Sequence, residues 1–179
     1  DLRGANFTDA FVSGADLSGA DLSGADLTRA DLSYADLSST KLIDAVLSVA
    51  ILDNAILNGA DLRSAVLSSA GLTDATLRGA DLRGADLRNA HFFRSDLGGA
   101  DLSSAVFGRT SISSVDLSDA RGLEFVTHRG PSSIGVDTFC KSRGNIPLEF
   151  LRGCGVPEGL LEVLLSLVGG LDSIQHSAY

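Results

Sequence analysis

Apolar residues recur at every fifth position over the first two thirds of the chain. From residue 2 to residue 117 all 24 such positions are apolar, and 19 of them are Leu. A second series runs from residue 5 to residue 120, where 20 of 24 positions are Ala. A period of five fits neither the helical repeat of 3.6 residues nor the two-residue repeat of a long strand. The pattern therefore predicts short structural units in one unbroken register.

Each five-residue unit predicts a very short strand followed by a bend. In residues 15–19, Ala15 and Leu17 are two positions apart, so both point to one side of an extended segment while Asp16 points to the other. Ser18 and Gly19 fill the last two places, where a chain turns most easily. Repetition of this unit closes a spiral with Leu and Ala inside and polar residues outside. Its backbone groups pair with the coils above and below, which leaves open edges only at the two ends.

The units in residues 15–24 and 80–89 resemble the pentapeptide-repeat family, whose pattern is Ala-(Asp/Asn)-Leu followed by two variable residues. This resemblance covers residues 1–120 and implies an all-β fold, a right-handed quadrilateral β-helix. Four units per coil correspond to 20 residues per turn, and hence to about six coils. Burial of one Leu stabilises by roughly 1.5–3 kcal/mol, while ordering the backbone of one residue costs roughly 1–2 kcal/mol. A single coil is therefore expected to depend on stacking.

The composition changes after residue 120, where all the Glu residues of the chain lie. Pro131 and Pro157 predict helices over 132–142 and 158–168, with a further helical turn over 146–152. Residues 121–170 are predicted to form a small α-helical cap over the last coil, and residues 171–179 a linker or tail.

Motifs at 128–135, 142–147 and 150–157 resemble a segment of bacterial multidomain proteins that follows pentapeptide repeats and precedes a TIR signalling domain. This second resemblance implies that the chain is the repeat portion of a larger signalling or defence protein.

Charge and motifs exclude several classes of function. The net charge of −9 argues against non-specific nucleic-acid binding, which needs a basic surface. No apolar run reaches the roughly 18 residues of a membrane span. No catalytic triad, phosphate-binding loop or metal-ligand spacing occurs, so we expect no enzyme activity, no cofactor and no catalytic, cofactor-binding or metal-binding residue. The expected location is cytoplasmic, without nucleic-acid or membrane partners.

Two Cys residues and one His residue are isolated side chains of a reactive or ligand-binding type. Cys140 and Cys154 are expected to be buried small side chains in the cap. His128 is expected in a turn; the alternative is an anion site at the start of the helix predicted after Pro131.

Asp residues 20 positions apart form columns along the outside of the predicted coil. The favoured interpretation is that each Asp caps its own turn through a bond to the backbone; a metal site is less favoured. The alternative is an acidic DNA mimic that inhibits or protects DNA gyrase, as the resemblance to quinolone-resistance pentapeptide proteins implies. The uneven charge weakens this alternative, because residues 1–60 hold 9 Asp against 3 Lys and Arg, while residues 61–120 hold 8 against 6.

The third coil, residues 41–60, departs most from the polar outer pattern. Outward positions there are apolar, and one more apolar residue follows in the next coil. We call this set the apolar belt: Ile43, Val46, Val49, Ile51, Ile56 and Val66. Such a patch is typical of a contact surface, although drift at surface positions stays open as an alternative.

The helix predicted after Pro157 is apolar on nearly every side, whereas a surface helix would show one stripe. One face is expected to cover the last coil, and the other to meet a partner, most simply a second copy. The expected contact residues are Leu161, Leu164, Leu165 and Val168.

Residues 1–5 are already in full repeat register, so either further residues precede them or rods stack end to end. The sequence thus predicts a non-enzymatic scaffold that forms a homo-oligomer, a dimer in the simplest case, or binds an unknown protein partner.

Overall fold

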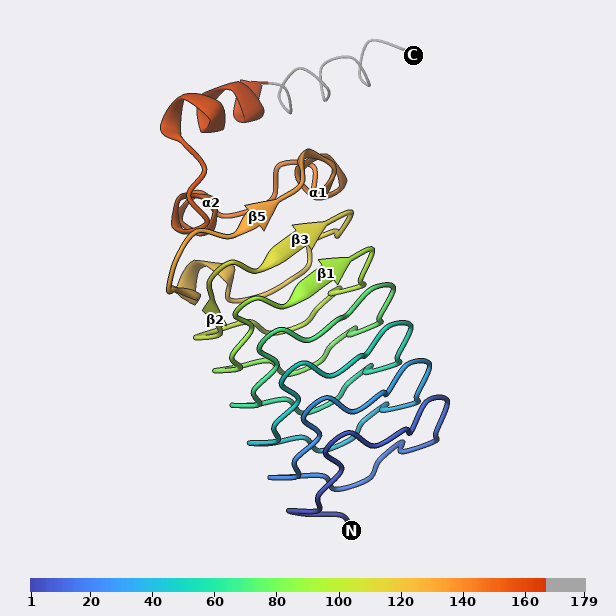
Figure 1. Ribbon diagram of the computed structural model, residues 1–179. Helices are drawn as coiled ribbons and strands as arrows, with labels where there is room; N and C mark the ends of the chain where they lie inside the picture. Colours follow the sequence, from blue (N-terminus) through green and yellow to red (C-terminus); the bar gives the residue numbers. More distant parts are fainter. Residues whose placement is uncertain (167–179) are drawn as a thin grey trace, which may run out of the picture.

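The computed structural model describes residues 1–166, and its repeats form a stack of coils that rises from the N-terminus (Figure 1). Outward residues 20 positions apart form parallel β-bridges, from the pair Asn6 and Asp26 to the pair Asp101 and Arg121. Twenty residues are four five-residue units, as the family resemblance implies. The prediction of an all-β solenoid is confirmed.

Backbone hydrogen bonds tie each coil to both of its neighbours. The amide of Leu22 donates to the carbonyl of Lys41 in the next coil at 2.8 Å, and the amide of Asp26 donates to the carbonyl of Ala5 in the preceding coil at 2.9 Å. Within a unit, the amide of Ala25 donates to the carbonyl of Leu22 at 3.0 Å and closes the turn. The third residue of this turn, Gly24, has a φ of 68°, the signature of a type II turn.

The Leu and Ala series line one continuous core. From Leu22 onward every residue of the Leu series is at most 2% exposed, so each coil buries its large side chains against the next. Three polar residues interrupt the Ala series, and each donates its hydroxyl to a carbonyl 23 residues earlier. These bonds join Thr40 to Leu17 at 2.9 Å, Ser95 to Leu72 at 2.7 Å and Thr110 to Leu87 at 2.8 Å. The hydroxyl groups of these three buried residues therefore all have a hydrogen-bond acceptor inside the core.

The named strands lie at the C-terminal end of the stack. One parallel sheet contains β1 (His91–Phe93), β3 (Ser111–Ser113) and β5 (Ser133–Ile134), and a second contains β2 (Val106–Phe107) and β4 (Thr127–His128). Val106 pairs with Thr127 and Ser111 with Ser133, so the spacing widens from 20 residues to 21 and 22. Solenoidal pairing therefore passes the domain boundary expected at residue 120.

Short helices follow the last paired strand. They are the 3-10 helix η1 (Leu123–Phe125), α1 (Val136–Lys141) and α2 (Leu148–Gly153), and a further helix begins at Glu158 and continues to Ser166. The prediction that a helix begins directly after Pro131 is wrong, because β5 occupies that segment and pairs with β3. The helical turn predicted over 146–152 is present as α2.

Helix α1 supplies acceptors to the last coil of the repeat region. The hydroxyl of Thr138 accepts from the amide of Val115 at 3.2 Å, and the hydroxyl of Ser142 accepts from the amide of Leu117 at 2.9 Å. In earlier coils the amide equivalent to Leu117 donates to the next coil, as Leu77 does to Asp96 at 2.7 Å, so Ser142 replaces that missing neighbour. The amides equivalent to Val115 instead close their own turn, as Ala75 does to Leu72 at 3.3 Å. The short helix α1 and its C-cap residue Ser142 thus satisfy backbone amides where the regular stacking stops.

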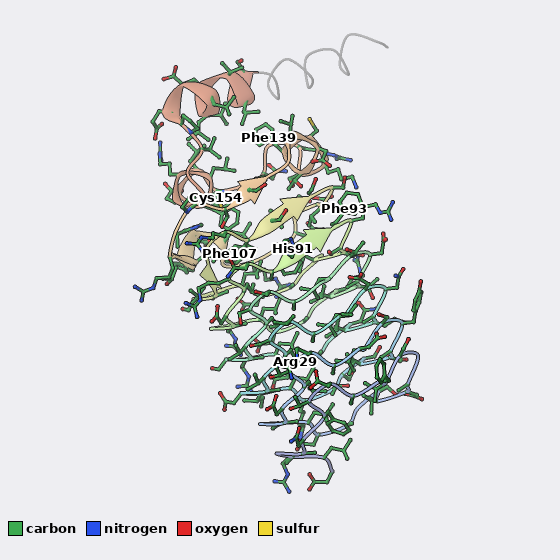
Figure 2. The ribbon with its side chains drawn as sticks, viewed as in Figure 1. Arg29, His91, Phe93, Phe107, Phe139 and Cys154 are labelled. Carbon is green, nitrogen blue, oxygen red and sulfur yellow. The ribbon has the colours of Figure 1, made fainter. Side chains whose placement is uncertain are left out.

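An aromatic cluster joins α2 to the solenoid. Phe107 of β2, labelled in Figure 2, and Phe150 of α2 pack edge to face with 5.5 Å between ring centroids. The His128 ring lies 5.4 Å from that of Phe150. Burial lowers the pKa of His128. The anion site considered for His128 is not formed, because this residue belongs to β4 and the segment directly after Pro131 forms β5 before α1 begins at Val136.

Candidate interaction surface

The apolar belt runs around the third coil and extends into the fourth. Bridges stack Asp26 on Val46 and Val46 on Val66, so an acidic position becomes apolar for two successive coils. The same happens on the next side, where Asp31 stacks on Ile51 and Ile51 on Gly71. The predicted stacking of Val66 over Val46 is therefore correct.

Belt residues differ in how far they reach into solvent. Val49 is 51% exposed, Ile51 44% and Ile56 38%. Ile43, Val46 and Val66 are half-buried. The structure thus brings the belt residues onto one coil and its neighbour, and three of them offer substantial apolar surface.

The third coil lacks the turn caps that its neighbour has. In the second coil, all four acidic residues accept a bond from the amide two positions later, as Asp21 does from Ser23 at 3.1 Å and Asp36 from Ser38 at 2.9 Å. Across residues 1–166 no side chain accepts a bond from the amides of the corresponding third-coil residues, which are Ile43, Ser48, Asp53 and Asn58. Replacing Asp by aliphatic residues therefore sacrifices local hydrogen bonds.

Val49 occupies a left-handed corner with a φ of 61°. The other non-glycine corners carry Asp, Asn, Ser, Arg or Tyr, and Val49 is the one β-branched residue among the positive-φ positions of the described chain. This conformation is a steric outlier for a β-branched side chain. Selection for stability alone would disfavour such a residue, so Val49 and the missing caps together make the third coil locally strained.

One side of the coil collects most of the exposed large apolar side chains. Phe11 is 90% exposed, Tyr34 66%, Ile51 44% and Phe93 42%, and all four occupy outward positions of the same side. We call this surface, made by residues 11–14 and their equivalents in later coils, the aromatic side. The sequence analysis did not group Phe11, Tyr34 and Phe93 as one surface. The 20-residue period could have found this surface. Subtracting multiples of 20 from the residue numbers places all four residues at positions 11–14 of the coil.

The terminal helix presents only part of its predicted contact face. Leu161 is 2% exposed and packs in the core, so its prediction as an outward contact residue is wrong. Leu164 is partly buried against the core, while Leu165 is 45% exposed. Val168 lies outside the described residues. Leu160 and Val163, which were not predicted, are exposed beside Leu165.

Most outward Asp residues cap their own turn, as predicted. Asp16 accepts both the amide and the hydroxyl of Ser18, at 3.0 and 2.7 Å, and these bonds lower the pKa of its carboxyl. The hydroxyl and the amide of Ser23 lower the pKa of Asp21 in the same way. The carboxylates are therefore stabilised as anions by their own turn.

Arg residues neutralise the acidic columns in the later coils. Arg63 pairs with Asp61 at 2.6 Å and approaches Asp81 at 3.7 Å, and Arg83 pairs with Asp81 at 2.6 Å. The hydrogen bond from Arg63 is the main reason why the pKa of Asp61 is lowered. The Arg side chains of the later coils thus offset the charge of neighbouring Asp residues.

The two cysteines lie in different surroundings. Cys154 is buried, and desolvation raises the pKa of its thiol to about 12. Cys140 is exposed, which corrects the prediction, because α1 turns Thr138 and Phe139 rather than Cys140 toward the core.

The surface hollow and the groups of titratable side chains do not form a catalytic or metal-binding site within the described residues. An open hollow of about 480 Å³ is lined by Asp86, Arg88, Val106 and Arg129, and Arg88 is already paired with Asp86. Within residues 1–166 no three His, Cys, Asp or Glu residues are grouped to hold a metal ion. No helix of the described part is long and apolar enough to cross a membrane.

The geometry can be compared with known proteins. A family model described as pentapeptide repeats matches residues 1–33, 30–68 and 70–109, in 8 copies. HetL, a pentapeptide repeat protein involved in heterocyst differentiation regulation in the cyanobacterium Nostoc sp. strain PCC 7120, is 31% identical, with 76% of this chain and 70% of HetL covered and a TM-score of 0.43. The pentapeptide repeat protein alr5209 from Nostoc PCC 7120 is 44% identical over 47% of this chain and 67% of its own, with a TM-score of 0.44. QnrB1, a plasmid-mediated fluoroquinolone resistance protein, is 19% identical over 75% of this chain and 79% of its own, with a TM-score of 0.42. No curated protein gives a significant match to the chain.

Proposed function

Because the chain belongs to the pentapeptide-repeat family, we propose that it is a non-enzymatic scaffold that associates with itself or docks a protein partner. The observation that carries this proposal is the apolar belt. The third coil gives up its turn caps and holds Val49 in a disfavoured conformation, and in return exposes aliphatic surface. Local sacrifices of this kind are typical of functional surfaces.

The proposal includes the finer architecture. It takes residues 1–120 as about six coils of a right-handed quadrilateral helix, residues 121–170 as a cap and residues 171–179 as a linker or tail. The bonds from Val115 and Leu117 to α1 support a capping role. The motifs at 128–135, 142–147 and 150–157 support a place next to a TIR domain in a bacterial cytoplasmic protein, where free thiols such as Cys140 stay reduced.

Light scattering during size-exclusion chromatography tests self-association over a range of concentrations. The matched variants are Ile51→Asn on the belt and Leu165→Asn on the terminal helix, because both residues are exposed and neither is needed to fill the core. We expect the wild-type mass to exceed that of a monomer at high concentration and one variant to restore the monomer. A wild-type chain that stays monomeric throughout would overturn self-association.

The second candidate function, an acidic mimic of DNA that acts on gyrase, rests on the first two coils. Asp16, Asp26 and Asp36 have Ser or Thr as hydrogen-bond partners, so these carboxylates keep their negative charge. Two other Asp residues of these coils, Asp1 and Asp9, pair with Arg. The Arg partners of Asp61 and Asp81 remove that charge further along. A supercoiling assay with purified gyrase separates the two functions, and inhibition by the chain at stoichiometric amounts would favour the mimic.

A further inference from the structure

Building on the scaffold role proposed above, we infer that the aromatic side binds a second copy of the chain in an antiparallel dimer. A two-fold axis lies in the contact plane, perpendicular to the rod, between the third coil and the fourth coil (residues 61–80). Each outward position then faces the same position on the second copy, with the coils in reverse order. The third coil faces the fourth, the second faces the fifth and the first faces the sixth, and every contact occurs twice.

Side-chain size is complementary in this arrangement. Ile51, 44% exposed, faces Gly71, where the lack of a side chain leaves a notch between Ile51 and His91 in the same column. Phe93, at the outer edge of β1 (Figure 2), faces Ser33. Phe11 faces Ser111 in the same way. Three large apolar side chains on each copy therefore meet a small residue on the other.

Charge is complementary as well. Asp31 faces His91 of the second copy. Tyr34, 66% exposed, faces Arg94, a guanidinium that already stacks on an aromatic ring of its own chain, 4.8 Å from the centroid of Phe93. A guanidinium over a Tyr face is a favourable cation–π contact. The pairing therefore places Asp31 beside the His91 imidazole and Tyr34 over Arg94, whose guanidinium also pairs with Asp74 of its own chain at 2.6 Å.

Other two-fold arrangements bring like charges together. An axis through the third coil places Asp53 against its own copy, and an axis through the fourth coil does the same for Asp74. A parallel dimer, with the axis along the rod, brings Arg94 to the imidazole of His91 and away from Tyr34. Like-charge contacts of this kind disfavour a register, so the axis between the two coils is selected.

The contact is small, because it uses one side of a rod roughly 29 Å long and about 12 Å wide. This area is well below the roughly 800 Å² per partner of a standard interface. We therefore expect a weak dimer, populated at high concentration or when a larger assembly holds two copies together.

Disulfide trapping tests the register. The double variant Ser33→Cys and Phe93→Cys is made with Cys140→Ser, so that the exposed native thiol is absent. Three coils, about 14 Å, separate positions 33 and 93 in one chain, which is too far for an intrachain bond. Under mild oxidation we expect the double variant to form a covalent dimer. Each single variant is the control and should yield little, because neither position faces itself.

A bump variant tests the notch independently. Gly71 does not have a positive φ, and a Cβ there would meet only the carboxylate of Asp53 at 3.2 Å, so Gly71→Leu is compatible with the fold after a small shift of that side chain. Thr76→Leu, the equivalent position on the next side, is the control. Sedimentation velocity should show at least a tenfold weaker dimer for Gly71→Leu and no loss for Thr76→Leu. Unchanged circular dichroism verifies folding of both.

The outcomes separate this inference from the scaffold proposal. A wild-type dimer that is unaffected by Gly71→Leu, with no crosslink from the double variant, overturns the inference while self-association through another surface stands. A wild-type chain that is monomeric and gives no crosslink overturns both. Efficient crosslinking by either single variant would place the axis through a coil and refute the register.

Discussion

Replacement of Val49 by Asn should stabilise the protein, although it removes an apolar side chain. Val49 sits at a corner with a φ of 61°, where Asn54 and Asn89 occupy equivalent corners at 61° and 59°. Asn tolerates this conformation because its short polar side chain can bond locally, whereas a β-branched residue is strained there. The substitution therefore relieves strain without the extra unfolded-state entropy that Gly would introduce.

The magnitude follows from two opposing effects. A residue held in a sparsely populated backbone region costs about 1–3 kcal/mol. Val49 is 51% exposed, so Asn forfeits about half the burial of a Val side chain, roughly 0.7 kcal/mol. The expected net gain is about 1 kcal/mol, which raises Tm by roughly 2–4 °C for a chain of this size.

Urea denaturation followed by circular dichroism measures this change. Ser69→Asn is the matched control, because Ser69 occupies the same corner one coil later with the same φ of 61° and is not β-branched. It should change the free energy of unfolding by less than about 0.5 kcal/mol. The reverse substitution, Ser69→Val, should destabilise. A Val49→Asn variant that is less stable than wild type would refute the strain argument and return the belt to neutral drift.

Three further predictions concern the core, the aromatic cluster and the thiols. Leu57→Ala should destabilise by about 2–5 kcal/mol in urea denaturation, because Leu57 is fully buried between coils, whereas Leu2→Ala, at a partly buried site, should cost much less. His128 has a lowered pKa in the folded protein, so the unfolded chain binds its proton first and stability should fall as pH drops from about 7 to 5. His128→Phe should flatten that pH profile, and an unchanged profile would assign the effect elsewhere. A thiol reagent at mildly alkaline pH should label Cys140 in the folded protein and Cys154 only after unfolding, as mass spectrometry of the labelled peptides would show.

The repeat region could be predicted because every unit meets the same surroundings. An Ala and the Leu two positions later determine which face of each short strand points into the core. Because the register is unbroken, the same face points inward in every coil. The polar exceptions Thr40 and Thr110 fit the same scheme, since their hydroxyls find carbonyls inside the core. The pattern within one five-residue unit is therefore sufficient to predict the fold of the whole repeat region.

The C-terminal region could not be predicted in the same detail because its contacts are not local. The widening of the spacing to 21 and 22 residues allows β4 and β5 to pair after the pattern has ended. Burial of His128 depends on Phe150, which is 22 residues away and arrives on α2. Leu161 turns inward and joins the buried cluster that also contains Phe139 and Leu151 of the preceding helices. The short sequence motifs do not specify these contacts between distant segments.

The twenty-residue spacing of the β-bridges makes the rod sensitive to the length of any insertion or deletion. Gain or loss of twenty residues changes its length by one strand spacing, about 4.8 Å, and leaves every later side chain on its original side. Gain or loss of five residues instead carries everything downstream a quarter of the way around the rod. Ile51 and Phe93 would then point in different directions. Lineages of this protein should therefore tolerate length changes in blocks of twenty residues between these two positions, and select against blocks of five.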